Sequence, residues 1–246
     1  MDRMLYVSMS GAKQTMLAMA ANSHNLANVN TTGYKADFSA FRSMPVFGEG
    51  LPSRVYAMAE RPGVDLASGM INSTGRELDM AIKGDGWIAV QASDGTEAYT
   101  REGNLQVSEN GLLTTGTGHL VLGNSGPIAI PPAQKIEIAA DGTISIHPLG
   151  QAPNALAVVD RIKLVKPEHN KMEKDTDSLM HLKNGGVADP DATVSLVSGA
   201  LESSNVNPVE ALVTMISLSR QFELQMKAMK TVGDNESSSS QMLRLG

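Results

Sequence analysis

The side chains that most often catalyse reactions or bind metals are scattered along this chain. No His is paired with another His or with an acid at the spacing that places two metal ligands on one helix face. The His residues stand at five separate places: His24, His119, His147, His169 and His181. The sequence contains no Cys, which excludes a disulfide framework, a thiolate zinc site and a thiol nucleophile.

One segment begins like a calcium-binding loop. Asp189-Pro190-Asp191 offers oxygen ligands at a suitable spacing, but Val194 stands where the sharp turn of such a loop needs Gly. Ala200 stands where the loop needs a bidentate acid. We therefore predict no metal site here.

Short glycine-containing loops resemble phosphate-binding or nucleophile loops only in part. Gly84-Asp85-Gly86 and Gly116-Thr117-Gly118 lack the third Gly and the following helix that would bind a phosphate. Gly123-Asn124-Ser125-Gly126 lacks the Gly-x-Ser-x-Gly spacing of a hydrolase nucleophile. The sequence therefore predicts a protein that is not an enzyme and that has no cofactor.

Charge and hydropathy exclude two further classes. The net charge is -6 and the 20 basic residues form no cluster, so nucleic acid is not an expected partner. No run of about 18 apolar residues occurs, so no membrane-spanning helix is expected. Ser8, Ser10 and Lys13 interrupt the apolar start of the chain, so a cleaved secretory signal peptide is not expected. If the protein acts outside the cytoplasm, another export route must carry it.

Two amphipathic helices are predicted, one at each end of the chain. The first runs from about Met4 to Leu26, and the second begins at Asn207-Pro208-Val209-Glu210, where Asn caps the helix and Pro needs no N–H partner. Apolar residues spaced three and four apart form one stripe on each helix. The candidate assembly residues on these stripes are Leu5, Met9, Ala12, Met16, Met19, Leu26, Leu212, Met215, Ile216, Phe222, Met226 and Met229.

The middle of the chain has the alternating pattern of strands, and the turn pairs Asp94-Gly95, Asn110-Gly111, Asp141-Gly142 and Asn184-Gly185 separate them. The predicted fold class is α+β: long N- and C-terminal helices pair as a coiled coil, and an antiparallel β-rich domain is inserted between them. The predicted boundaries are 1–36 for the N-terminal helix and motif, 37–74 for an extended connector, 75–198 for the β-rich domain and 199–246 for the C-terminal helix.

Four motifs follow one another along the chain, at Asn25 to Ala36, Thr74 to Trp87, Tyr99 to Leu105 and Leu201 to Glu210. Together they resemble the motifs of the bacterial flagellar rod and hook proteins. The run from Asn25 to Ala36 is similar to the N-terminal rod motif, Thr74 to Trp87 to the central signature, Tyr99 to Leu105 to the next strand, and Leu201 to Glu210 to the C-terminal motif. The candidate motif residues are Asn25, Leu26, Ala27, Asn28, Thr32, Gly33, Tyr34, Lys35, Asn205, Val206, Asn207, Pro208 and Glu210.

Within this family, the first residues, the stretch 40–46 and the modest length are most similar to a proximal rod subunit, with the distal rod subunit as the alternative. Trp87 stands where the family commonly has Phe, and His24 where Asn is common. The resemblance implies a structural subunit of the flagellar basal body that polymerises into the torque-transmitting rod in the periplasm. Its implied partners are copies of itself, other rod proteins and, during transit, the flagellar type III export apparatus.

Two other classes remain open from the residues alone. The acids of the β-rich domain could line the cleft of a periplasmic hydrolase. The terminal helices could instead complete the core of a monomeric binding module, because amphipathic stripes commonly cover the core of their own domain. If the helices need neighbouring subunits, we expect them to be largely disordered in the free monomer and to fold on docking.

Overall fold

The computed structural model describes residues 2–38, 41–45, 55–59, 63–148, 156–175 and 177–244. Parts of the predicted connector, 39–40, 46–54 and 60–62, lie outside the described residues. The chain divides into a helical unit, made of residues 1–28, 37–65 and 206–246, and a strand unit, made of residues 29–36 and 66–205. We describe each unit by itself.

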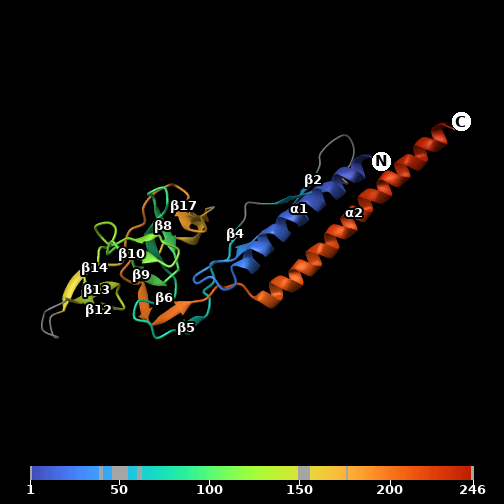
Figure 1. Ribbon diagram of the computed structural model, residues 1–246. Coiled ribbons are helices and arrows are strands. Elements are labelled where there is room, and N and C mark those ends of the chain that lie inside the picture. Colours follow the sequence, from blue (N-terminus) through green and yellow to red (C-terminus); the bar gives the residue numbers. More distant parts are fainter. Residues whose placement is uncertain are drawn as a thin grey trace. The chain divides into compact units, whose positions relative to one another are not determined.

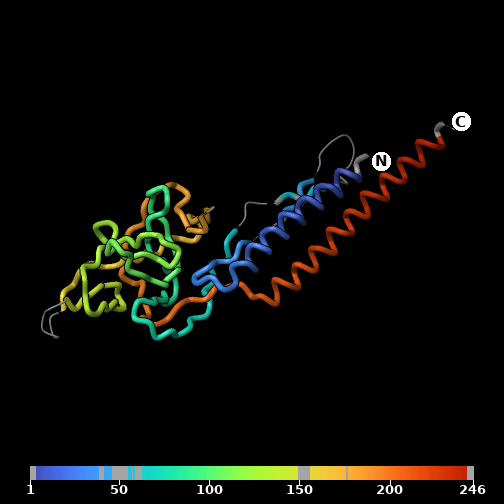
Figure 2. The backbone as a smooth tube through the Cα atoms, viewed as in Figure 1, coloured from blue at the N-terminus to red at the C-terminus, as the bar shows by residue number. Residues whose placement is uncertain are grey.

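The helical unit contains two long helices and four short strands (Figure 1). These elements are α1 (Asp2–Ala27), β1 (Asp37–Phe38), β2 (Phe41–Pro45), β3 (Val55–Ala59), β4 (Gly63–Val64) and α2 (Pro208–Arg244). The strands pair antiparallel as β1 with β4 and as β2 with β3, and β3 packs against α1. The two helices lie side by side and run in opposite directions, as Figure 2 shows.

Small and polar residues make the contact between the helices. Ala12, Thr15 and Ala18 are buried on α1, and a Cβ on Gly11 would lie 2.9 Å from Nε2 of Gln225. The side chain of Asn22 donates a 2.7 Å hydrogen bond to the Ala211 carbonyl on α2. The absence of a side chain at Gly11 therefore makes room for a polar side chain of the facing helix.

The α+β class fits the structure, but the predicted coiled coil is wrong. The described residues contain one helix near each end and a large antiparallel β-rich body. A coiled coil inserts large apolar residues of the heptad into the facing helix. Here Met9 and Met16 of the expected seam are 50% and 58% exposed. The helix contact is rotated away from them toward the smaller side chains.

The strand unit is antiparallel throughout its described strands. Its largest sheet has the order β16-β17-β8-β7-β11-β10-β9, with β15 paired to β7, and a second sheet has the order β12-β13-β14. Two further pairs are β18 with β6 and β19 with β5. The strands are β5 (Ile71–Ser73), β6 (Met80–Lys83), β7 (Trp87–Gln91), β8 (Glu97–Thr100), β9 (Leu105–Val107), β10 (Leu113–Thr115), β11 (Leu120–Val121), β12 (Ala133–Ile138), β13 (Thr143–Pro148), β14 (Ala157–Arg161), β15 (Leu164–Val165), β16 (Met172–Lys174), β17 (Met180–Leu182), β18 (Ser195–Ser198) and β19 (Ala200–Glu202), with a 3-10 turn at His169–Lys171.

The core of the strand unit is aliphatic. Ile88 and Val90 of β7 are fully buried together with Leu113 of β10 and Ile144 of β13, so one core joins the large sheet to the three-stranded sheet. Gly95, Gly111, Gly142 and Gly185 have positive φ angles, as the predicted turn pairs require. The alternating pattern of the sequence is therefore matched by hairpins with glycine turns.

Candidate assembly interface

The second helix begins at a capped N-terminus. The Oδ1 atom of Asn207 accepts hydrogen bonds from the backbone N–H groups of Val209 at 3.0 Å and Glu210 at 3.4 Å. Pro208 is the first helical residue, where a missing N–H group costs nothing. These contacts fix the start of α2, and with it the side of the helix on which each apolar residue lies.

The first half of α2 is apolar on two opposite sides. Ala211, Met215 and Phe222 lie on the side that is wholly or partly buried. Leu212 and Ile216 belong to an exposed side and are 51% and 56% accessible to solvent. A surface helix normally turns its apolar side toward the core of its own protein. The single helical unit covers only one side of this one.

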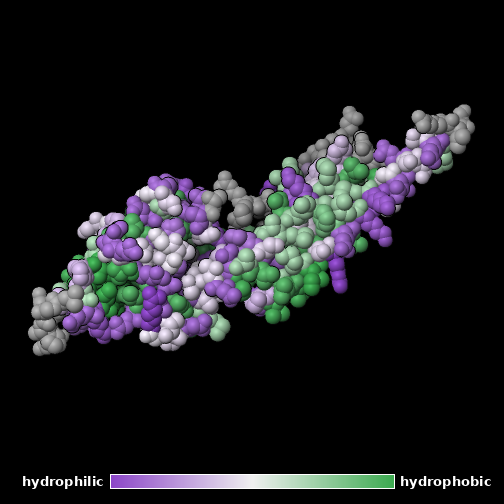
Figure 3. All heavy atoms as spheres, viewed as in Figure 1, coloured by the Kyte–Doolittle hydropathy of each residue, from purple (hydrophilic) through white to green (hydrophobic). Residues whose placement is uncertain are grey.

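Apolar and polar side chains of α2 together line a hollow of about 460 Å³. Its lining residues are Val213, Ile216, Ser217, Arg220, Gln221 and Leu224. Figure 3 shows hydrophobic residues gathered over the helical unit near the beginning of α2. We call the exposed residues Val209, Leu212, Val213, Ile216 and Leu224 the outer face of α2.

The first helix also has an exposed apolar side. Tyr6, Met9, Met16 and Leu17 are all exposed, and Lys13 lies among them on the helix surface. Contiguous exposed apolar surface is commonly a site of interaction with another molecule. We call Tyr6, Met9, Met16 and Leu17 the outer face of α1.

The residues predicted to form the assembly interface differ in exposure. Ala12 is buried, and the exposed ones are Met9, Met16, Leu212, Ile216 and Met226. The half-buried ones are Leu5, Met19, Leu26, Met215, Phe222 and Met229. Sequence reasoning did not assign Tyr6, Leu17, Val209 or Leu224 to the interface. The signal that could have found the α2 residues is the second apolar stripe beside the first.

The end of α1 is held by the N-terminal motif. Asn25 donates a 2.9 Å hydrogen bond from Nδ2 to the Asp37 carbonyl and accepts one of 2.8 Å at Oδ1 from the Asp37 N–H group. His24 Nδ1 lies 2.8 Å from the Asp37 carboxylate, and Asn28 donates a 2.9 Å hydrogen bond to the His24 carbonyl. The side chain of Asn25 thus binds the backbone where the chain re-enters the helical unit.

Lys35 of the N-terminal motif lies in a buried polar cluster of the strand unit. Glu202 is 1% exposed, and its carboxylate accepts hydrogen bonds from Lys35 Nζ at 2.7 Å, Arg101 Nη1 at 3.0 Å and the Gly69 N–H group at 2.9 Å. The Arg101 guanidinium also donates to the carbonyls of Gly86 at 3.0 Å and Gly84 at 2.9 Å. One carboxylate therefore joins the N-terminal motif, the Tyr99–Leu105 motif and the C-terminal motif, and Arg101 extends the link to the central signature. We call Lys35, Arg101 and Glu202 the motif cluster.

Neighbouring motif residues close over this cluster. Asn205 Oδ1 accepts a 2.8 Å hydrogen bond from the Ala36 N–H group, and Lys174 Nζ lies 4.0 Å from the centre of the Tyr34 ring. Gly33 has a φ angle of +68° and donates from its N–H group to the Glu202 carbonyl at 2.8 Å. Arg101 and Glu202 lie within motifs found in the sequence, but the sequence assigned them no role, since no local pattern shows that their side chains are in contact.

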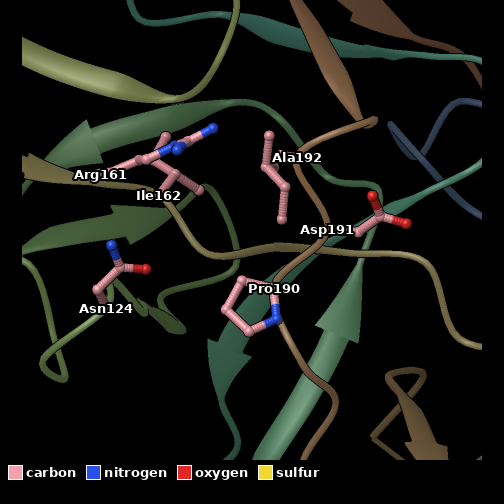
Figure 4. A pocket seen from close by; sticks show the side chains of 7 residues that line it. Asn124, Arg161, Ile162, Pro190, Asp191 and Ala192 are labelled. Atoms are coloured by element: carbon pink, nitrogen blue, oxygen red, sulfur yellow. The ribbon is translucent and has the colours of Figure 1, made fainter.

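The other polar sites carry no catalytic arrangement among the described residues. A pocket of about 430 Å³ places Pro190, Asp191 and Ala192 opposite Asn124, Arg161 and Ile162 (Figure 4). Its charged groups are already engaged by hydrogen bonds to other protein groups. The Asp191 carboxylate accepts from Thr193, and Arg161 Nε donates to the Asp141 carbonyl.

The pKa shifts of the titratable groups also arise from local hydrogen bonds and from burial. Hydrogen bonds from Thr96, Thr143 and Thr193 hold the pKa values of the Asp94, Asp141 and Asp191 carboxyl groups, respectively, below their ordinary range. Burial raises the pKa of the Tyr99 hydroxyl. No cluster of three or more His, Asp or Glu side chains suited to a metal occurs in the described part of the chain.

Comparison with known proteins decides the family. Three family models match in chain order: a flagella basal body rod protein model over residues 5–35, a flagellar hook protein FlgE/F/G D1 domain model over residues 81–146, and a flagellar basal body rod FlgEFG protein C-terminal model over residues 197–242. The flagellar basal-body rod protein FlgF of Salmonella typhimurium is 44% identical over 251 residues, covering 100% of both chains. The chain belongs to the flagellar basal-body rod protein family.

Further relatives refine the position of this rod protein. FlgF of Escherichia coli is 43% identical over 100% of both chains, whereas FlgG of Bacillus subtilis is 33% identical over 94% of this chain and 95% of its own. The rod protein is therefore more similar to these FlgF proteins than to that FlgG. The predictions of a FlgF-like rod protein, of a structural role in the proximal rod and of a protein that is not an enzyme are confirmed.

Family membership also places the rod protein in the flagellar basal body and indicates assembly with other rod proteins. None of the described helices is long and apolar enough to cross a membrane. The motif cluster has a structural role in this rod protein. The residues by which the chain resembles rod proteins hold its strand unit together and fix the ends of its helices.

Proposed function

We propose that this rod protein polymerises through the outer faces of α1 and α2 and thereby forms part of the shaft that transmits torque. The main support for this proposal is that α2 has apolar residues on two opposite sides between Val209 and Leu224. Full burial of a large apolar side chain contributes about 1.5–3 kcal/mol. Exposed apolar residues on two helices therefore offer a large driving force for association.

Contacts between copies would be heterologous. A contact between different faces that does not close into a ring generates a helical filament. The outer face of α2 and the outer face of α1 are different surfaces. The outer face of α2 on one copy can therefore bind the outer face of α1 on its neighbour. The predicted interface residues that are half-buried, such as Phe222 and Met229, would be less available to a neighbouring copy than the outer faces.

We further propose that the flagellar type III export apparatus carries the chain and that it assembles in the periplasm next to other rod subunits. The absence of Cys supports this route because no disulfide can form during transit. The domain boundaries predicted from the sequence, 1–36, 37–74, 75–198 and 199–246, belong to the same proposal: the helices at the two ends assemble, and the strands between them stiffen the subunit.

The test replaces one apolar residue of the outer face by an acid. In cells whose own copy carries Ile216→Asp, we expect the protein to be exported but absent from isolated basal bodies, because a buried unpaired charge costs several kcal/mol. Ser237→Asp is the matched control, since Ser237 is an exposed polar residue of the same helix. Basal bodies that contain Ile216→Asp at the normal level would overturn the proposal.

A further inference from the structure

The methionines of this chain are divided between two environments. The chain has 15 Met and no Cys, so thioethers are its only sulfur atoms. In the strand unit, Met80, Met172 and Met180 are 1%, 5% and 3% exposed. In the helical unit, the exposed methionines are Met4, Met9, Met16, Met44, Met58, Met226 and Met242. Met70 of the strand unit is also exposed, at 75%, so oxidant in the solvent reaches the helical unit and Met70 before it reaches the buried methionines.

Two of these methionines lie within the outer face of α1. Met9 and Met16 are two helical turns apart, so their side chains lie on the same side of the helix. Exposed Tyr6 and Leu17 lie beside them. In the proposed function this face loses its water when a neighbouring copy docks, and the inference that follows rests on that proposal.

We propose that Met9 and Met16 are oxidation sites of the unassembled subunit, and that their oxidation by peroxide blocks assembly. An oxygen atom of the peroxide is transferred to the methionine sulfur, the O–O bond breaks, and water leaves. The sulfur is oxidised by two electrons to the sulfoxide and the peroxide is reduced. The sulfoxide is a polar group, and its burial in an apolar contact without a hydrogen-bond donor is unfavourable.

The exposed Met9 and Met16 thus make assembly of a subunit depend on its oxidation state. Methionine sulfoxide can be reduced again by sulfoxide reductases, so an oxidised subunit is not lost. Burial protects a thioether, so docking of the outer face of α1 would end the sensitive period. The buried Met80, Met172 and Met180 are already protected by the folded strand unit, so oxidation leaves the core of that unit intact.

The first measurement is the order of oxidation. The full chain is treated with hydrogen peroxide, and mass spectrometry of its peptides follows each methionine with time. We expect Met9 and Met16 to be converted to sulfoxide while Met80, Met172 and Met180 remain unmodified. Oxidation of Met80 at the rate of Met9 would overturn the proposal.

The second measurement links oxidation to assembly in cells that lack methionine sulfoxide reductases. Peroxide given during rod assembly should lower the amount of wild-type chain in isolated basal bodies about tenfold, the change that corresponds to about 1.4 kcal/mol. The double variant M9L/M16L keeps size and hydrophobicity without an oxidisable sulfur, so it should assemble equally with and without peroxide. M9Q/M16Q, which is polar without oxidant, should assemble poorly in both conditions.

The outcomes separate this inference from the proposed function. If M9L/M16L loses assembly under peroxide as strongly as the wild type, oxidation acts elsewhere and the inference is wrong. If peroxide-treated wild type assembles normally with Met9 and Met16 oxidised, the inference is also wrong. The proposed function would still stand in both cases as long as Ile216→Asp is excluded from basal bodies.

Discussion

Lys35 and Glu202 are separated by 167 residues in the sequence, yet Nζ of the first lies 2.7 Å from Oε1 of the second. Their side chains are only 3% and 1% exposed. The same carboxylate also binds Arg101, whose guanidinium lies 5.3 Å from the centre of the Trp87 ring. The first and the last segments of the strand unit are therefore tied to its centre by one buried anion.

Replacing that anion should destabilise the strand unit strongly. Glu202→Gln keeps the shape of the side chain but removes the charge that Lys35 and Arg101 contact, and breaking a buried ion pair costs about 3–5 kcal/mol. Urea unfolding followed by Trp87 fluorescence measures the loss. Glu137→Gln is the control, because Glu137 pairs with Lys135 on the surface and should leave the midpoint nearly unchanged. Equal midpoints for the two variants would refute the role of the cluster.

Gly33 should tolerate no side chain. Its φ angle is +68°, and a Cβ would lie 2.3 Å from the carbonyl carbon of Arg101. Gly75 has a similar φ angle of +72° but no atom within 4 Å of a Cβ, so Gly75→Ala isolates the cost of the left-handed backbone, about 1–2 kcal/mol. Thermal unfolding should show a clearly larger loss for Gly33→Ala. A loss no larger than that of Gly75→Ala would mean that the N-terminal motif does not pack as described.

Acid should weaken three Asp-x-Thr turns. The Thr hydrogen bonds hold the pKa values of Asp94, Asp141 and Asp191 below the ordinary 3.8, so the folded state releases these protons more readily than the unfolded state. The resulting stabilisation is fully present above pH 3.8 and is lost as the pH falls through the lowered pKa values.

The measurement is the unfolding midpoint as a function of pH. The triple variant Thr96→Val, Thr143→Val and Thr193→Val should lose less stability below about pH 4 than the wild type, because its carboxyl groups keep pKa values nearer to the unfolded ones. Thr114→Val is the control, since the Thr114 hydroxyl donates to the Gln106 carbonyl and not to a carboxylate. Parallel pH curves for the triple variant and the wild type would contradict the assignment.

The helices of a free subunit should exchange their amide protons faster than the sheet. The helix contact buries mainly small residues, whereas Ile88, Ala89 and Val90 of β7 are 0% exposed. Local opening is easiest where few apolar contacts resist it. Hydrogen exchange of dilute protein, read by mass spectrometry, should show early exchange in 5–26 and 209–229 and late exchange in β7. Equally slow exchange in both regions would favour a helical unit that needs no neighbours.

The sequence by itself determined those elements that depend on neighbouring residues. The cap at Asn207 with Pro208 predicts a helix start, and α2 begins at Pro208. The Asp-Gly and Asn-Gly pairs predict hairpin turns because glycine adopts positive φ without strain, and Gly95, Gly111, Gly142 and Gly185 do so. The ordered motifs also predict the rod family, since each motif is a short local pattern.

The tertiary structure decided what depends on residues far apart. The heptad spacing shows which residues share a stripe but not toward which neighbour the stripe turns, so the expected coiled coil was wrong and Gly11 faces Gln225 instead. No local pattern brings Lys35, Arg101 and Glu202 together, because a buried charge is stable only where folding supplies its partners from other segments. Side-chain periodicity is a property of one element, whereas burial is a property of the elements packed around it.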